Sequence, residues 1–103
     1  MSISLEAREG EEVLLKPTGD IAANYVSELR TVLRKSVEAK PAVMTLDLSD
    51  VKTIDASGVG LLIAASNSMG RTGGRVMVTN VSDEIAELLR ALRIHQLFGV
   101  ASE

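Results

Sequence analysis

The sequence predicts a small α/β fold, in which a mixed β-sheet carries helices mainly on one face. Two short strand-like segments near the N-terminus, residues 3–8 and 13–16, are separated by a turn. Three later segments repeat apolar residues every three or four positions, as amphipathic helices do, and two apolar strands lie between them. Strands joined through helices pair in parallel with right-handed connections, which places helices between neighbouring strands on the same face.

The N-terminal segments predict an antiparallel hairpin. Residues 3–8 alternate apolar and polar side chains, and residues 13–16 are mostly apolar. Gly10 lies in the short connection between them, where a tight turn is expected. Residues 43–48 are apolar at most positions, which indicates a central strand, and residues 75–79 form the next strand. The tail, residues 94–100, is too apolar to be free, so we expect it to dock at the sheet edge as a short strand or extended segment.

Each helix is predicted from its apolar stripe. The first helix, capped by Asp20 or Asn24 and closed by Lys40-Pro41, is expected to bury Val26, Leu29, Val32, Leu33 and Val37. The second begins near Ser57 and ends before Gly70, with an inward stripe of Val59, Leu62, Ile63, Ser66 and Met69. The third begins at about Ser82, with a stripe of Ile85, Leu88, Leu89 and Leu92.

Composition limits the classes of function. The 103 residues are 46% hydrophobic and 24% charged, so we expect residues 1–103 to form one globular domain. The chain has no cysteine, which excludes disulfides and thiolate metal sites. No leader or apolar run of spanning length is present, so a cytoplasmic protein without membrane insertion is expected. An exposed sheet edge leaves weak homodimerisation open.

Nucleic acid is not an expected partner. The formal net charge is −3, Tyr25 and Phe98 are the only aromatic residues, and no basic cluster is denser than Arg34-Lys35. Nucleic-acid-binding domains usually carry a basic surface with aromatic side chains for stacking.

The segment from Ile54 to Gly60 is the candidate functional site. It lies where a strand's exit loop becomes the second helix, and functional residues of open α/β sheets gather beyond the carboxyl ends of strands. Ser57 is expected at or next to the helix N-cap, while Gly58 and Gly60 are poor helix formers. Either Ser57 or Asp55 is simply a cap and the glycines ease packing, or Ser57 is a phosphoacceptor. A phosphate at that position would be stabilised by free N–H groups and the helix dipole.

Neighbouring residues extend this hypothesis. Asp20, Asn24 and Tyr25 open the first helix at the same end of the sheet, where they either widen a binding surface or, for Asp20 and Asn24, act as caps. Leu61 falls about 130° from the buried stripe of its helix, so it is either a partner contact or a singly exposed leucine. Asp55 either orients the Ser57 hydroxyl or accepts N–H groups of the helix start.

No catalytic, cofactor or metal site is expected. Asp47, Asp50 and Asp55 are not placed to converge on one metal ion. The chain lacks both the third glycine of a dinucleotide fingerprint and the Gly-Lys-Ser/Thr of a phosphate loop. His95, the only histidine, has no serine and acid arrangement to join.

The residues of this segment resemble a known family. The run Leu46-Asp47-Leu48-Ser49, followed by Ile54-Asp55-Ala56-Ser57-Gly58-Val59-Gly60-Leu61-Leu62, is similar to STAS domains, and especially to bacterial anti-sigma factor antagonists. The resemblance covers nearly the whole chain, with further matches at Thr18-Gly19-Asp20, Gly73-Gly74, Thr79-Asn80-Val81 and Leu97-Phe98.

The resemblance implies a partner switch. In similar proteins the unmodified antagonist binds an anti-sigma factor, which is an ATP-dependent serine kinase, and so frees a sigma factor. The kinase phosphorylates the serine before the motif glycine, here Ser57, and a metal-dependent serine phosphatase reverses the reaction. The implied partner-binding residues are Asp20, Asn24, Asp55, Ala56, Ser57, Gly58, Gly60 and Leu61; Ala56 replaces a second serine that the family often has. The resemblance leaves an alternative open, because stand-alone domains of this kind also serve as accessory subunits of lipid-transport ATPases or as scaffold pieces of stress-signalling complexes.

Overall fold

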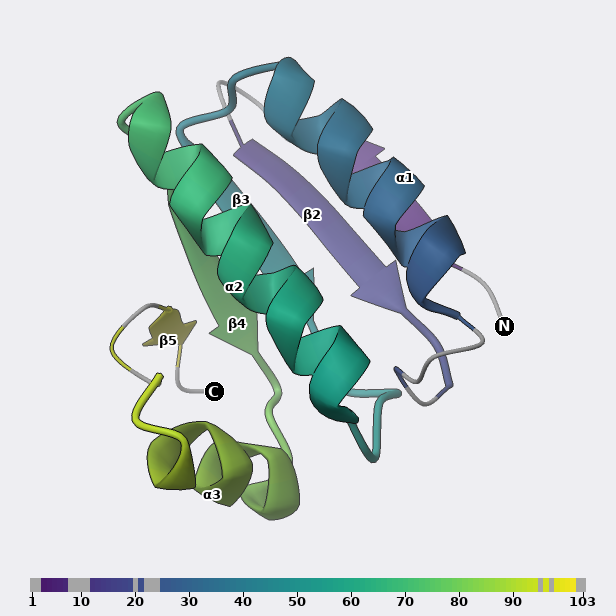
Figure 1. Cartoon of the computed structure of the whole chain (residues 1–103). Helices are drawn as coiled ribbons and strands as arrows, with labels where there is room; N and C mark the ends of the chain where they lie inside the picture. Colours follow the sequence, from purple (N-terminus) through teal and green to yellow (C-terminus); the bar gives the residue numbers. More distant parts are fainter. Residues whose placement is uncertain are drawn as a thin grey trace.

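A computed structural model describes residues 3–7, 12–19, 21, 25–94, 96 and 98–101 of the chain (Figure 1). The elements follow the order β1 (Ile3–Ala7), β2 (Glu12–Pro17), α1 (Val26–Glu38), β3 (Val43–Asp47), α2 (Ala56–Arg71), β4 (Arg75–Thr79), α3 (Asp83–Ala91) and β5 (Gly99–Ala101). The α/β class and the three helices agree with the sequence prediction.

The strands form one sheet in the order β1-β2-β3-β4-β5. β1 and β2 pair antiparallel, with Ile3 opposite Pro17 and Ala7 opposite Val13, and the residues that connect them lie outside the described part of the chain. The pairs β2–β3, β3–β4 and β4–β5 are parallel. The apolar tail therefore docks at the sheet edge as the short strand β5, as predicted, and Phe98 just before it is buried.

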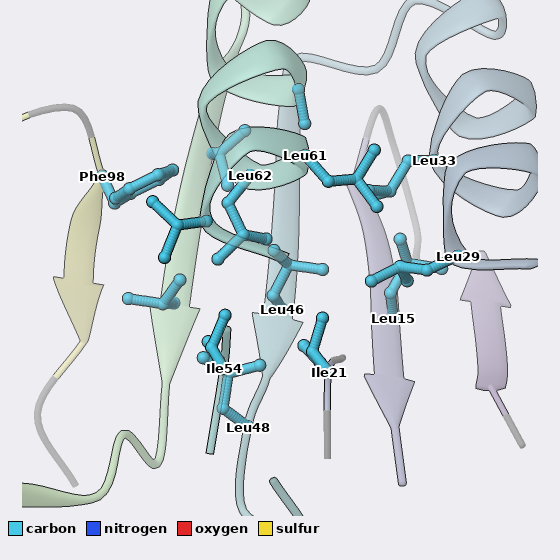
Figure 2. Packing of buried hydrophobic residues seen from close by; sticks show 14 of the residues in the cluster. Leu15, Ile21, Leu29, Leu33, Leu46, Leu48, Ile54, Leu61, Leu62 and Phe98 are labelled. Carbon is cyan, nitrogen blue, oxygen red and sulfur yellow. The ribbon is translucent and has the colours of Figure 1, made fainter. Parts of the chain in front are cut away.

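Helices α1 and α2 lie side by side on one face of the sheet (Figure 1). Strands β3 and β4 turn alternate side chains toward them, because successive residues of a strand point to opposite faces. Met44, Leu46, Val76 and Val78 are almost fully buried on this face. Figure 2 shows how Leu46 lies below Leu62 of α2 within this layer. The main core therefore lies between the sheet and the α1–α2 pair.

The buried face of α2 is wider than the predicted stripe. Its buried residues are Gly58, Val59, Leu61, Leu62, Ala65 and Met69. Of the other residues expected to point inward, Ile63 is partly buried and packs against the core, and Ser66 is half-buried. The buried face is wider because α2 packs against α1 as well as against the sheet.

Helix α3 lies beyond the carboxyl end of β4 (Figure 1). Ser82 caps it, and its side chain accepts a hydrogen bond from the Ile85 N–H at 3.2 Å. Ile85 and Leu89 are buried, but Leu92, which the sequence placed on the apolar stripe, is 49% exposed at the C-cap. The stripe therefore ends one turn earlier than predicted.

The start of α1 differs from the prediction. Tyr25 occupies the N-cap position and makes no side-chain capping hydrogen bond. The sequence assigned this cap to Asp20 or Asn24, which both lie outside the described residues. No helix in the described part of the chain is long and apolar enough to span a bilayer.

Candidate functional site

The loops that follow β2 and β3 are held together by backbone hydrogen bonds. Ile21 N–H donates to the Thr53 carbonyl at 3.0 Å, and Asp55 N–H donates to the Ile21 carbonyl at 3.0 Å. Ile21 and Ile54 form an isolated parallel bridge. Because β2 and β3 are parallel neighbours, both loops leave the sheet at the carboxyl ends of these strands. Helix α2 begins there, and the loop after β2 packs against its first turn.

Asp55 is the N-cap of α2. Its backbone is extended, and its Oδ1 accepts a hydrogen bond from the Gly58 N–H at 3.0 Å. The first backbone bond of the helix runs from the Val59 N–H to the Asp55 carbonyl at 2.9 Å. The expectation that Asp55 accepts a backbone N–H of the helix start is therefore confirmed.

Ser57 is the second residue of α2 and is exposed, as are Asp55 and Ala56. Since Asp55 satisfies the Gly58 N–H, the two N–H groups without a partner inside the helix are those of Ala56 and Ser57. These groups and the helix dipole make the first turn favourable for a negative charge. The geometry can present the Ser57 hydroxyl to the active site of another protein, and a phosphate added there lies in a favourable electrostatic position.

The two motif glycines have different surroundings. Gly58 is buried, and a β-carbon on it would lie 2.6 Å from Cγ2 of Ile21 and 2.7 Å from Cγ2 of Ile54. The expectation that Gly58 contacts a partner was therefore wrong; its missing side chain lets the loop after β2 pack against α2. Gly60 is exposed, and a β-carbon there would meet no atom within 4 Å. Packing within the chain thus requires glycine at position 58 but not at position 60.

Leu61 is not the exposed contact that the sequence suggested. Only 8% of its surface is exposed, and Figure 2 shows its side chain directed from α2 toward Leu33 of α1. Leu61 lies off the stripe that faces the sheet, but it is buried because α1 covers a second side of α2. Leu61 belongs to the contact between the two helices.

Of the three residues proposed at the start of the first helix, Asp20 and Asn24 lie outside the described residues. Tyr25 is 1% exposed, so its expected place on a binding surface was wrong. Burial raises the pKa of the Tyr25 phenol, and the negative charge of Glu28 raises it further, while a hydrogen bond with the Thr18 backbone opposes both effects. The buried Tyr25 side chain therefore holds the loop after β2 through its hydrogen bond with the Thr18 backbone.

Ile21 is the residue of this site that the sequence analysis missed. It is 1% exposed and contacts the position of Gly58. In the sequence it is only one apolar residue of the short segment Ile21-Ala22-Ala23, and its contact partners lie on a different loop and on α2. A long-range contact of this kind leaves no periodic pattern.

The aspartates near the site make separate local contacts. Asp47 Oδ1 accepts hydrogen bonds from the Asn80 side chain and the Ser49 N–H, both at 3.0 Å. Burial works against the charge of Asp47, but these bonds and the nearby Lys16 outweigh it and lower its pKa. Asp50 pairs with Lys16 at 3.8 Å across an exposed surface. Among the described residues, no three His, Cys, Asp or Glu side chains cluster closely enough to hold a metal ion.

The comparisons with known proteins agree with this geometry. The family model described as STAS domain matches residues 2–103. An anti-sigma-B factor antagonist of Listeria monocytogenes is 19% identical over 100 residues, which cover 97% of this chain and 88% of the relative.

Two solved structures share the fold. The phosphorylated form of the Bacillus cell fate determinant SpoIIAA has a TM-score of 0.77 and 18% identity, over 99% of this chain and 93% of that protein. An anti-sigma factor antagonist from Mycobacterium paratuberculosis has a TM-score of 0.85 and 18% identity, over 96% and 83% of the two chains. The family match spans almost every residue, including the helix start at Ser57, and the chain therefore belongs to the STAS domain family.

Proposed function

We propose that this protein is a phosphorylation-switched anti-sigma factor antagonist with no enzymatic activity of its own. In its unmodified form it binds an anti-sigma serine kinase and frees a sigma factor, and phosphorylation of Ser57 blocks this binding. The observation that carries the proposal is the exposed Ser57 hydroxyl in the first turn of α2, next to two helix N–H groups.

The switch acts at the interface and leaves the fold intact. A phosphate adds about −1.5 to −2 charges at neutral pH. The helix start stabilises these charges while Ser57 is in water. A docked partner would have to bury them against a surface that had accommodated an uncharged hydroxyl, which costs desolvation energy and space. Phosphorylation therefore favours dissociation.

The surface around Ser57 consists of the exposed residues Asp55, Ala56 and Gly60. Gly60 leaves open space beside the hydroxyl, so a partner backbone can approach closely. Asp20 and Asn24 belong to the same proposed surface, because the loop that carries them is joined to this one through Ile21. Gly58 supports the surface from below without contacting the partner.

The proposal names two partners, an anti-sigma factor serine kinase and a metal-dependent serine phosphatase that removes the phosphate. It is supported by the similar antagonist from Listeria and by the SpoIIAA structure, which was solved in a phosphorylated form. Such exchange takes place in the cytoplasm, and we propose that location and a single domain over residues 1–103 for this protein.

The test is affinity capture from the native cell with wild-type, Ser57→Ala and Ser57→Asp proteins, followed by binding measurements with the purified captured kinase. The Ala variant should bind as wild type does, and the Asp variant should bind at least about tenfold more weakly. Ser27→Asp is the matched control, because Ser27 is the exposed second residue of α1. Intact-mass analysis should place one phosphate on Ser57. Equal binding of the Asp variant would refute the switch, and capture of a transport ATPase would favour the accessory-subunit role.

A further inference from the structure

A groove of about 290 Å³ runs between α1 and α2 on the surface away from the sheet. We define the α1/α2 groove by its lining residues, which are Arg30, Leu33, Arg34, Val37, Glu38, Leu61, Ala64, Ala65 and Ser68. Its floor is apolar, because Leu33, Leu61 and Ala65 are buried between the helices. Figure 2 shows Leu33 and Leu61 facing each other there.

The two walls of the groove differ in charge. The α2 wall consists of small residues, and the helix carries no charged residue from Ala56 to Gly70. The α1 wall carries Arg30 and Arg34, both exposed, with Glu38 one turn after Arg34. The only ion pair among the described residues joins Lys16 to Asp50, so neither arginine is neutralised by a salt bridge there. The groove thus combines an apolar floor with a positively charged wall on a chain of net charge −3.

The groove is continuous with the surface at Ser57. Ser57, Gly60, Ala64 and Ser68 follow one another at spacings of three and four residues, so they share one face of α2. This face extends about 16 Å along the helix axis at 1.5 Å per residue. A partner that contacts Ser57 can therefore reach the groove without leaving α2.

We propose that the α1/α2 groove seats an amphipathic helix of the same partner that binds at Ser57, with acidic side chains of that helix against Arg30 and Arg34. The inference rests on the proposed function and names the chemistry of its interface. An apolar groove between two helices that lie side by side suits the apolar ridge of a third helix, which is the helix-in-groove mode of recognition. The small residues on the α2 wall let that helix approach closely, and the arginines select for acidic residues beside its apolar ridge.

The first test is a matched pair of charge reversals, measured with the purified kinase captured by the Ser57→Ala protein. Arg34→Glu should weaken binding at least about tenfold and reduce its dependence on salt concentration. Arg90→Glu makes the same charge change at an exposed arginine of α3 and should bind as wild type does. Ala64→Trp, which fills the groove from an exposed position without changing charge, should also weaken binding. Far-UV circular dichroism confirms that each variant is folded.

The second test places a photo-crosslinking amino acid at position 64 of the otherwise wild-type protein. The crosslinked kinase peptide should come from a helix with an acidic and an apolar face. If the Arg34→Glu and Ala64→Trp variants bind the kinase normally while the protein phosphorylated at Ser57 does not, the groove inference is wrong and the proposed switch remains supported. A crosslink to a non-helical segment would also overturn it. So would a long-chain carboxylic acid that native mass spectrometry detects bound in the groove. If the unmodified protein captures no kinase, the proposed function and the inference fail together.

Discussion

A β-carbon on Gly58 would lie 2.6 Å from Cγ2 of Ile21 and 3.0 Å from the carbonyl oxygen of the same residue. That carbonyl already accepts the Asp55 N–H at 3.0 Å, so it cannot move away without loosening the helix start. The first turn of α2, the loop after β2 and the loop after β3 thus meet at one glycine. The position of the Ser57 hydroxyl depends on this contact, although Gly58 itself is buried.

Substitution of the two motif glycines should therefore have opposite effects on stability. We expect Gly58→Ala to lower the free energy of unfolding by about 1–3 kcal/mol, because the added methyl group overpacks a site bounded by backbone. Gly60→Ala should raise it by about 0.4–1 kcal/mol, since the methyl group enters open space and alanine favours the helix. Urea denaturation of both variants measures the difference. Equal destabilisation by the two substitutions would contradict this account.

The helix start should depend on Asp55 and tolerate charge at Ser57. Asp55→Ala removes the acceptor for the Gly58 N–H and should cost about 1 kcal/mol, whereas Asp55→Asn keeps an acceptor and should cost less. Ser57→Asp should leave stability unchanged or raise it by about 0.3–1 kcal/mol, because a negative charge in the first turn complements the helix dipole. Thermal unfolding at low salt shows both effects. A strongly destabilised Ser57→Asp protein would mean that phosphorylation disrupts the fold rather than the interface.

Leu61 should behave as a core residue. We expect Leu61→Ala to lower the free energy of unfolding by about 2–5 kcal/mol, because it removes the contact with Leu33 and leaves a cavity between α1 and α2. Leu92→Ala is the matched control, since Leu92 is 49% exposed, and it should change stability by less than about 0.5 kcal/mol. Chemical denaturation of the two variants checks the contrast. Similar changes in the free energy of unfolding for both variants would show that Leu61 is not a core residue.

The sequence was sufficient for features that depend on local periodicity. The apolar character of residues 43–48 predicted a central strand, and β3 lies between β2 and β4 in the sheet. The cap at Ser82 matches the predicted start of α3. It was insufficient where two elements meet. Leu61 is buried because α2 contacts α1 as well as the sheet, and no sequence pattern within α2 indicates that second contact. The contact of Ile21 with Gly58 joins two loops that are distant in the chain.

The candidate site was also predicted only in part. The position of Ser57 at an exposed helix start followed from a serine and glycines placed between a strand and a helix. The different surroundings of Gly58 and Gly60 did not follow, because both are glycines in one helical turn. Their difference arises from which side of the turn faces Ile21, and only the assembled loops determine that side.

Tyr25 should make stability depend on alkaline pH. Burial, helped by Glu28 and opposed by the Thr18 hydrogen bond, raises the pKa of Tyr25 above its usual 10.0 in the folded protein. The neutral phenol therefore stabilises the fold below pH 10, and this contribution is lost as the pH rises through the folded pKa. Because Tyr25 is the only tyrosine and the chain has no tryptophan, near-ultraviolet absorbance reports its ionisation alone. Tyr25→Phe should remove this alkaline loss, and a normal ionisation curve for wild type would refute the prediction.

Asp47 should make stability depend on acidic pH in the opposite sense. Burial disfavours its charge, but the hydrogen bonds from Asn80 and Ser49, together with Lys16, lower its pKa below the usual 3.8. The carboxylate therefore stabilises the folded state fully above that usual value, and the contribution disappears as the pH falls through the lower folded pKa. Asn80→Gly removes the amide donor and keeps a residue that accepts the positive φ of 56° at this position. We expect this variant to lose about 1 kcal/mol at neutral pH and to show a flatter decline between pH 5 and 2, about the range in which paired aspartates titrate. Urea denaturation at several pH values measures both, and a decline as steep as in wild type would show that the Asn80 bond does not hold the charge of Asp47.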